Sequence, residues 1–497
     1  MQVRYSTELQ SRLHQGQFEI LLEKQSRGGC PSQRHVMVRS GWMEPFQTRE
    51  LKRMNTLVEP SQKNSSPLFG TNSAKETILT PKPGLGRRFR DVRCFSEKIC
   101  EPLEPEDYVI QTMPEASPTK WHMAHTSWFF ETFVLKRFVP DYDSRHPQYN
   151  FLFNSYYNAV GPFFSRPHRG LLSRPTVKEV FQYRSDIDLL VSELIESADE
   201  PLLEKLESII TLGVNHEQQH QELMVTDIKN VFWHNPLRPG YRNRQPLKAS
   251  SVPVMQWLTF EAGIHSIGHN GPGFSFDNEG PRHRVFVESF GLGSRLVTNS
   301  EFLEFIEDGG YRRSELWLSL GWNAVNEKHW SSPLYWEKRE GKWFTMTLAG
   351  MTELVPEEPV CHVSLFEADA FARWSGGRLP TEQEWEIASA QSSLEGNFAD
   401  RELFHVGPLT SSNGCEFAQM FGDVWEWTQS SYSPYPGYAP APGALGEYNG
   451  KFMCNQYVLR GGSCATSQLH IRRTYRNFFP PDARWQFTGI RLAKDLV

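Results

Sequence analysis

The sequence predicts an α+β multidomain protein in which a four-helix bundle precedes a loop-rich α+β domain. Between residues 87 and 235, apolar residues recur at helical spacing, whereas after residue 255 short β-like runs alternate with many Gly, Pro and Asn residues. A chain of 497 residues is also too long for one ordinary hydrophobic core. We therefore divide it into a weakly ordered extension (1–85), the bundle (86–235), a linker (236–254) and the loop-rich domain (255–497).

Composition excludes several classes of function. The 52 basic and 58 acidic residues give a net charge of −6, and no basic segment suggests a nucleic-acid partner. No apolar run approaches the roughly 18 residues of a membrane span, and no apolar leader follows Met1. The seven cysteines are an odd number without a C-x-x-C pair, so a disulfide framework is not indicated. We expect a cytoplasmic protein.

Each segment supports this division. Residues 1–85 mix Gln, Ser, Pro and Arg without a sustained period. Helical patterns cover residues 89–100, 119–138, 176–196 and 202–233, and Pro, Arg, Asn and Ser dominate the linker. In the last domain we expect strands at 284–287 and 457–459 and helices at 299–307 and 367–374.

The fourth helical pattern contains His216-Glu217-Gln218-Gln219-His220. Four residues at about 100° each return to nearly the same side of a helix, so His216 and His220 can bind one metal ion. The same letters satisfy H-E-x-x-H, in which the Glu is the general base of zinc peptidases. The neighbouring amides of Gln218, Gln219 and Gln221 favour a polar, ligand-lined cavity instead.

The second helical pattern offers a third ligand. His122 and His125 lie three residues apart and cannot point equally inward, so spacing allows either one. Three neutral imidazoles leave several coordination positions open, as in the related 2-His-1-carboxylate ferrous sites, whereas zinc usually closes to four ligands.

The stretch between the second and third helices carries polar groups suited to a redox metal site. Tyr156 and Tyr157 are candidate donors of a proton or a hydrogen atom, although tyrosine pairs also serve as packing. Arg166 and Arg169 suit an anionic substrate.

Together these motifs resemble the ergothioneine-biosynthesis sulfoxide synthases, or hercynine oxygenases. The resemblance is carried by His125 in its Met-Ala-His-Thr context, by the 215–222 and 155–161 strings, and by four motifs of the carboxyl half (376–386, 422–427, 460–463 and 489–492). Members of that family join a DinB-like bundle to a formylglycine-generating-enzyme-like domain of C-type-lectin type. The match runs from about residue 87 to residue 492.

The resemblance implies a cofactor and a set of substrates. It implies that His125, His216 and His220 hold Fe(II), where O₂, a thiol and the imidazole of hercynine (N-α-trimethylhistidine) meet. A carbon–sulfur bond then forms at the imidazole C2, and the sulfur becomes a sulfoxide. Tyr156 and Tyr157 match the donor position of the subtype with a bundle-borne phenol. Gln219 matches a hydrogen-bond partner of hercynine.

The resemblance also implies partners for the thiol. Arg166 and Arg169 are similar to the arginines that hold its carboxylate, and Asn477, Phe478 and Phe479 fall in the late loop that closes the pocket. In the branch that uses γ-glutamylcysteine this loop resembles Asn-Trp-Asp. The departure favours free cysteine as the thiol.

Several alternatives remain at this stage. A γ-glutamylcysteine or selenium donor would keep the same site, and an ovothiol-type enzyme would usually add a methyltransferase domain, for which no Gly-rich pattern follows. A formylglycine-generating enzyme would need two copper-binding cysteines where this chain has Thr466 and Ile471. A non-catalytic lectin-like binding protein would be favoured by a broken histidine set, but all three histidines are present.

Overall fold

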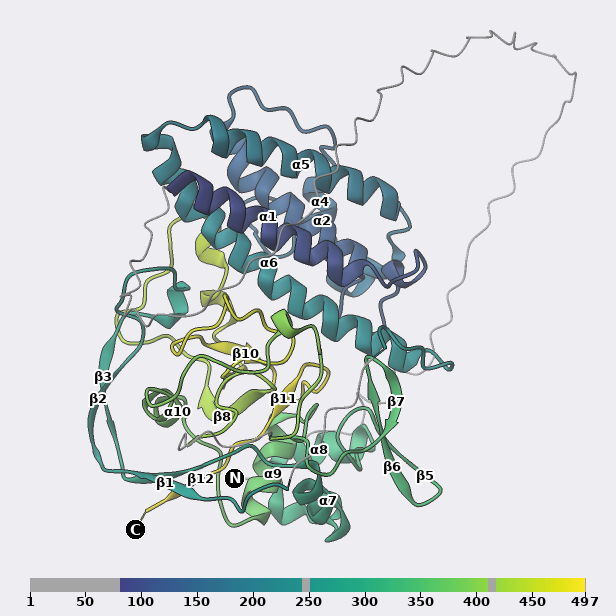
Figure 1. Ribbon diagram of the computed structural model, residues 1–497, viewed down its shortest axis with the longest axis vertical. Coiled ribbons are helices and arrows are strands. Elements are labelled where there is room, and N and C mark those ends of the chain that lie inside the picture. The colour runs from purple at the N-terminus through teal and green to yellow at the C-terminus, as the bar shows by residue number, and fades with distance from the viewer. Residues whose placement is uncertain (1–80, 244–250, 410–416, 497) are drawn as a thin grey trace, which may run out of the picture. The chain divides into compact units, whose positions relative to one another are not determined.

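The computed structural model describes residues 81–243, 251–409 and 417–496. The predicted extension therefore lies almost wholly outside the described residues. Four long helices form the amino-terminal part, and a mixed domain of short strands, loops and helices forms the rest (Figure 1). No helix in the described ranges is both long and apolar enough to cross a membrane.

Four helices build the bundle: α1 (Pro81–Cys100), α2 (Thr119–Phe130), α5 (Val177–Ser197) and α6 (Glu200–His234). Helix α1 begins at Pro81, before the predicted residue 89, and the first turn of a helix tolerates proline because its N–H groups make no hydrogen bond within the helix. The start of α5 is fixed by a capping box between Thr176 and Glu179.

The second helix is not uniform. Helix α2 continues as a π-helical segment, Glu131–Leu135, and ends in α3 (Lys136–Phe138), so the predicted 119–138 helix contains a change of pitch. Single π-helical turns are rare and often lie near functional sites. The predicted irregular stretch that follows contains α4 (Tyr149–Phe153) and a 3₁₀ helix, Arg166–Leu171.

The carboxyl-terminal domain contains four small sheets rather than one large one. Their strand orders are β1-β4-β12, β10-β9-β8-β11, β2-β3 and β5-β6-β7. The strand bounds are β1 (Trp257–Phe260), β2 (Gly263–Ile267), β3 (His283–Val287), β4 (Phe290–Gly293), β5 (Trp336–Arg339), β6 (Lys342–Thr347), β7 (Gly350–Glu353), β8 (Trp425–Ser431), β9 (Tyr457–Arg460), β10 (Asn477–Phe479), β11 (Thr488–Gly489) and β12 (Ala493–Asp495).

Helices of this domain include both predicted ones, α7 (Asn299–Glu307) and α9 (Leu365–Trp374). Two further helices were not predicted, α8 (Ser319–Glu327) and α10 (Glu382–Ser389). The capping box of α10, Thr381 with Glu384, is visible in the sequence, but its eight residues are too few to show a helical period.

Helix α6 joins the two halves. The partly buried carboxylate of Glu222 accepts hydrogen bonds from Trp425 Nε1 (2.7 Å), Ser463 Oγ (2.5 Å) and Thr466 Oγ1 (2.7 Å) of the carboxyl-terminal domain. In Figure 1, α6 is the bundle helix that runs along the top of that domain. The face of α6 that bears His216 and His220 is thereby held beside the loops of the second domain.

Candidate metal centre

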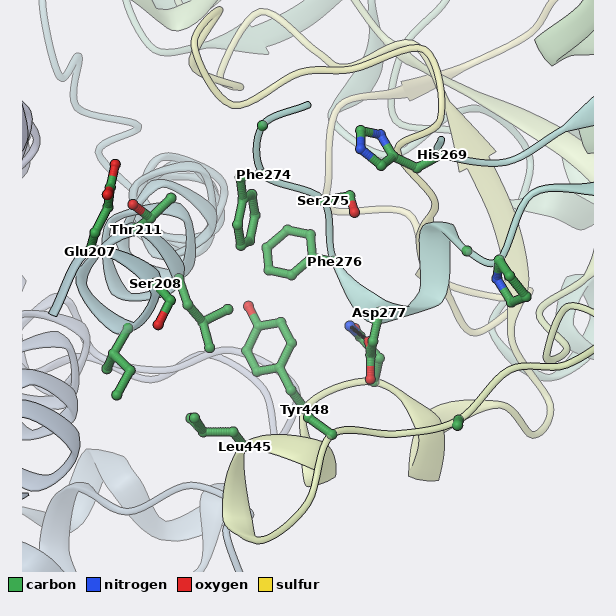
Figure 2. A pocket seen from close by; sticks show the side chains of 18 of the residues that line it. Glu207, Ser208, Thr211, His269, Phe274, Ser275, Phe276, Asp277, Leu445 and Tyr448 are labelled. Carbon is green, nitrogen blue, oxygen red and sulfur yellow. Dashed lines mark hydrogen bonds between the residues drawn. The ribbon is translucent and has the colours of Figure 1, made fainter. Parts of the chain in front are cut away.

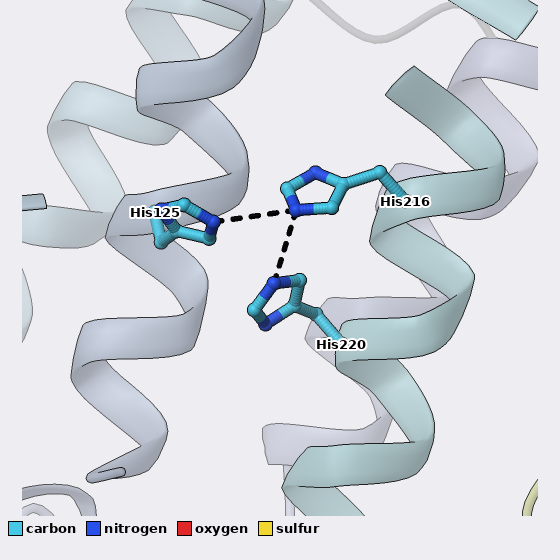
Figure 3. Close-up of side chains that lie close together, drawn as sticks. All are labelled: His125, His216 and His220. Atoms are coloured by element: carbon cyan, nitrogen blue, oxygen red, sulfur yellow. Dashed lines mark hydrogen bonds between the residues drawn. The ribbon is translucent and has the colours of Figure 1, made fainter. Parts of the chain in front are cut away.

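Three buried imidazoles converge in the bundle. The Nε2 atom of His216 lies 3.3 Å from Nε2 of His125 and 3.1 Å from Nε2 of His220. All three candidate ligand atoms lie within 4.8 Å of one another. Figure 3 shows one ring from α2 and two from α6 turned toward a common centre. Ligand atoms about 2.1 Å from one ion are separated by roughly 3 Å when they subtend a right angle, so the group fits a single metal ion.

Hydrogen bonds orient one of these rings from behind. His125 Nδ1 lies 2.5 Å from the carbonyl oxygen of Phe153, which can only accept, so Nδ1 carries the proton and Nε2 faces the centre as a free base. The His125 ring is stacked between Trp121 and Trp128, with centroid distances of 4.6 and 5.4 Å. Spacing alone left His122 and His125 open and the family resemblance implied His125; the structure brings His125 to the centre.

The environment keeps the imidazoles neutral. Burial lowers the pKa of His216 to about 3, and burial together with the neighbouring histidines lowers those of His125 and His220 well below the ordinary value. A neutral imidazole has the lone pair that a metal requires. The three rings therefore suit a cation without first losing a proton.

Glu217 faces away from this centre. Its buried carboxylate accepts hydrogen bonds from Arg93 Nη1 (2.9 Å), Arg184 Nη2 (2.6 Å) and Ser96 Oγ (2.6 Å). Burial raises the pKa of this carboxyl, but the charges of Arg184 and Arg93 outweigh burial and lower it to about 2. A carboxylate held in this way cannot act as the general base of an H-E-x-x-H peptidase at neutral pH.

A cavity of about 300 Å³ lies between the bundle and the carboxyl-terminal domain. Its lining combines polar groups with aromatic rings, and includes Tyr156, Arg166, Gln219, Glu222, Trp425, Tyr448, Phe452, Tyr475, Asn477, Phe478 and Phe479. Several of the residues named from the sequence thus share one wall. Asn477, Phe478 and Phe479 form β10, an edge strand, and Phe478 stacks on Tyr432 with a centroid distance of 4.1 Å.

The two tyrosines occupy different positions. Tyr156 lines the cavity, whereas Tyr157 is fully buried behind it, with the rings stacked at 4.8 Å. Burial raises the pKa of both phenols, so both remain protonated at neutral pH. The carbonyl oxygen of Tyr156 accepts a hydrogen bond from Lys451 Nζ, which fixes the loop against the carboxyl-terminal domain.

A directed chain of hydrogen bonds orients Gln219. Asn215 Nδ2 donates to the carbonyl oxygen of Thr211 (2.8 Å), so Asn215 Oδ1 accepts from His470 Nδ1 (3.0 Å). His470 Nε2 then accepts from the Tyr475 hydroxyl (2.9 Å), whose oxygen accepts from Gln219 Nε2 (2.5 Å). Because a carbonyl can only accept, the direction of every bond follows. The Gln219 amide oxygen is left for a ligand that donates.

The two arginines differ in availability. Arg166 lines the cavity, is exposed, and donates to the carbonyl oxygen of Glu115. Arg169 is buried, donates to Ser117 and Ser155, and lies 3.3 Å above the Trp121 ring. Trp121 in turn stacks on His125, so Arg169 supports the metal-binding helix and does not line the cavity.

Three residues of the site were not identified from the sequence. His470 and Tyr475 orient Gln219, and the Tyr448 ring lies 5.6 Å from that of His216. They stand in irregular segments far from the bundle in the chain, so no spacing rule connects them to the histidines.

A second, larger cavity of about 970 Å³ borders the site. Figure 2 shows Phe274, Phe276 and Tyr448 facing Ser208 and Thr211 of α6 across it. Tyr448 lines both cavities and stacks on Phe276 at 5.4 Å. Tyr448 therefore stands between the candidate metal centre and this outer space.

The chain matches two known domain families in order. The profile of the DinB superfamily matches residues 88–224, and that of the Sulfatase-modifying factor enzyme 1-like domain matches 244–408 and 405–496. These matches confirm the predicted fold class, a DinB-like helical region followed by a formylglycine-generating-enzyme-like domain.

Three relatives resemble the chain to different extents. It is 32% identical over 452 residues to the Hercynine oxygenase of Mycolicibacterium thermoresistibile, covering 83% of this chain and 95% of that protein. It is 32% identical over 429 residues to the Hercynine oxygenase of Mycolicibacterium smegmatis, covering 78% and 93%. The Ergothioneine biosynthesis protein 1 of Schizosaccharomyces pombe is 27% identical over 235 residues, which are 45% of this chain and 28% of that protein.

Proposed function

Because the chain belongs to the hercynine oxygenase family, we propose that it is a non-haem Fe(II)-dependent sulfoxide synthase of ergothioneine biosynthesis. It joins a thiol, most simply cysteine, to C2 of hercynine with O₂ and gives hercynylcysteine sulfoxide. The reaction is balanced as RSH plus hercynine C2–H plus O₂ giving the sulfoxide plus water. Its substrates are small molecules. The convergence of three Nε2 atoms on one centre is the observation that carries the proposal.

The residues present fit a ferrous ion. His125, His216 and His220 would hold it as neutral nitrogen ligands, and the donor set contains no cysteine that would favour zinc. When bound, Fe(II) supplies O₂ activation and lowers the pKa of a bound thiol. Tryptophans beside His125 and the adjacent Phe129 keep the bundle side of the centre apolar.

Gln219 would bind hercynine. Its amide oxygen is free to accept the N–H of the hercynine imidazole, because Nε2 is already committed to Tyr475. The aromatic rings of Trp425, Tyr448 and Phe452 in the same cavity suit the quaternary ammonium group. Gln219 precedes a metal ligand, so this hydrogen bond holds the ring beside the metal centre and lowers the entropic cost of reaction.

Tyr156 is our choice for the catalytic donor. It lines the cavity with its phenol protonated, while Tyr157 supports it from behind. We expect Tyr156→Phe to keep iron and thiol binding but to divert O₂ toward thiol oxidation, and Tyr157→Phe to have a smaller effect of the same kind. Product ratios by mass spectrometry measure this. An unchanged ratio in both variants would remove the tyrosines from the mechanism.

Arg166 lines the cavity and would bind the carboxylate of the thiol, and β10 forms part of the same lining. Arg169 is committed to Ser117 and Ser155, so we assign it the support of Trp121 and His125 instead. The apolar rings of Phe478 and Phe479 favour cysteine over the larger, more polar γ-glutamylcysteine. A γ-glutamylcysteine or selenium donor is the alternative.

Anaerobic reconstitution with Fe(II), followed by O₂, hercynine and each thiol separately, tests the function. We expect a product with the mass of hercynylcysteine sulfoxide from cysteine, and none from the His216→Ala variant. If γ-glutamylcysteine or a selenium donor gives the faster reaction, the thiol assignment is wrong. If no thiol gives a hercynine-derived product, the proposed function is wrong.

A further inference from the structure

The His220 ring continues into a second set of buried polar groups. Its Nδ1 lies 2.8 Å from Nδ1 of His122, and His122 Nε2 lies 3.1 Å from Oδ2 of Asp227. His122 and Asp227 are buried, and His220 is partly buried. His220 and Asp227 stand two turns apart on α6, and His122 enters between them from α2.

The contact between His122 and Asp227 fixes the direction of these hydrogen bonds. An ionised carboxylate can only accept, so His122 Nε2 carries a proton and donates to Asp227. With its Nε2 proton donated to Asp227, the neutral His122 ring has a lone pair on Nδ1, which can accept across the 2.8 Å contact with His220. His220 Nδ1 then donates to His122, and the lone pair of His220 is left on Nε2, the atom that faces the candidate metal centre.

We propose that His122 and Asp227 are positioning residues of the metal site, which fix the tautomer and the orientation of His220 through a carboxylate–histidine–histidine chain. The inference rests on the three-histidine site of the proposed function. Metal-binding histidines usually donate their second N–H to a carboxylate or carbonyl group. Here an additional imidazole spans the distance between them, and the negative charge of Asp227 makes His220 a stronger donor to the metal.

Other contacts of Asp227 agree with this role. The backbone N–H of Ser117 donates to the same oxygen, Oδ2, at 2.9 Å and fixes the carboxylate at the start of α2. His125 has its own acceptor, the carbonyl of Phe153, so two of the three ligand rings are oriented by separate partners. His122 therefore supports the ligand His220 and is not itself a ligand. This role accounts for a buried histidine at position 122 without a second metal ion.

Metal affinity tests the proposal independently of turnover. We expect His122→Phe and Asp227→Asn to bind Fe(II) about 10- to 100-fold more weakly than the wild type, the usual effect of removing such a partner. The measurement is an anaerobic competition titration with a chelator. The electron paramagnetic resonance spectrum of the Fe(II)–nitric oxide adduct should also change, because His220 is free to rotate.

Asn230→Ala is the matched control. Asn230 lies one turn beyond Asp227 on α6 and forms hydrogen bonds with Thr112 and Tyr335. Its substitution removes these hydrogen bonds but leaves those among His220, His122 and Asp227 in place. We expect its metal affinity and spectrum to match the wild type. Wild-type affinity and spectrum in both His122→Phe and Asp227→Asn would overturn the proposal, as would an equal loss of affinity in Asn230→Ala.

A measurement on the unaltered protein covers the case in which a variant fails to fold. In the Zn(II)-loaded full chain, labelled with ¹⁵N at histidine, we expect His122 to be protonated at Nε2 only and His220 at Nδ1 only. A proton on Nδ1 of His122 would overturn the proposal. Failure of the oxygenase assay with these protonation states intact would reject the proposed function and leave the positioning role standing.

Discussion

Glu217 shows how a residue inside a metal motif can serve stability. Its carboxylate is fully buried and bonded to Arg93, Arg184 and Ser96. Breaking a buried ion pair leaves uncompensated charges, so we expect Glu217→Gln to lower the free energy of unfolding by about 3 kcal/mol at pH 7. Urea unfolding measures this. Glu204→Gln, at an exposed position on the same helix, should change little.

The same carboxylate should make the free energy of unfolding depend on pH. Its pKa is lowered from 4.5 to about 2 in the folded protein, so the stability it contributes is complete above pH 4.5 and is lost as the pH falls toward 2. Unfolding free energies measured between pH 6 and pH 3 should therefore fall more steeply in the wild type than in Glu217→Gln. Parallel curves for the two proteins would contradict the assigned ion pairs.

Tyr475 provides a residue-scale test of the substrate contact. Tyr475→Phe keeps the ring but removes the hydroxyl between His470 and Gln219, so the Gln219 amide is free to turn. We expect the hercynine dissociation constant of the Fe(II) protein to rise about tenfold, the effect of one hydrogen bond of about 1.4 kcal/mol, while iron affinity is unchanged. Anaerobic calorimetry measures both.

Tyr435→Phe is the control for that experiment, because its hydroxyl bonds Glu382 and Arg460 inside the same domain. It should leave hercynine binding unchanged. An equal loss in both variants would indicate a general effect on the domain, and the Gln219 contact would then be wrong.

At the residue scale, spacing predicted part of the site. His216 and His220 share a helix face at i and i+4, so their pairing could be read from the sequence. Spacing could not choose between His122 and His125, because three residues separate them and both are buried, and only the family resemblance implied His125. His470 and Tyr475 could not be predicted either, since only the packing of distant loops brings them to Gln219.

At the element scale, α6 must lie close to α2 for His216 to meet His125. A Cβ atom added at Gly213 would lie 2.6 Å from Phe130 Cε1 and 2.9 Å from Phe129 Cε1, and both rings are buried. We expect Gly213→Ala to lower the free energy of unfolding by about 1–3 kcal/mol and to weaken metal binding. Thermal unfolding and chelator competition measure these effects.

Gly86→Ala in α1 is the matched control. Its nearest contact would be 3.4 Å, to the flexible end of Arg90, so the better helix propensity of Ala should stabilise the protein by up to about 1 kcal/mol. Stabilisation by both substitutions would contradict the close approach of α6 and α2.

The predictability of elements followed their length. The long amphipathic helices α5 and α6 were predicted to within a few residues, because many turns repeat one pattern. The π-helical segment and α4 were not, because each spans about one turn and depends on tertiary packing. Short strands such as β10 and β11 depend on partners distant in sequence, so period-two patterns do not reveal them.

At the scale of the molecule, Glu222 joins the two domains at the site. Its loss would leave Trp425 Nε1, Ser463 Oγ and Thr466 Oγ1 without their shared acceptor. We expect Glu222→Ala to lower the free energy of unfolding by about 2 kcal/mol and to weaken hercynine binding, with iron affinity retained. Glu207→Ala, exposed on the same helix, is the control. Loss of iron with unchanged hercynine binding would contradict this division of roles.

O₂ uptake by the Fe(II)-loaded full chain tests the central claim most directly. With cysteine present, we expect uptake to require hercynine, to consume one O₂ for each sulfoxide formed, and to be absent from His125→Ala, His216→Ala and His220→Ala. O₂ uptake that does not depend on hercynine, or that persists in any of these three variants, would contradict an oxygenase whose metal ion is bound by the three bundle histidines.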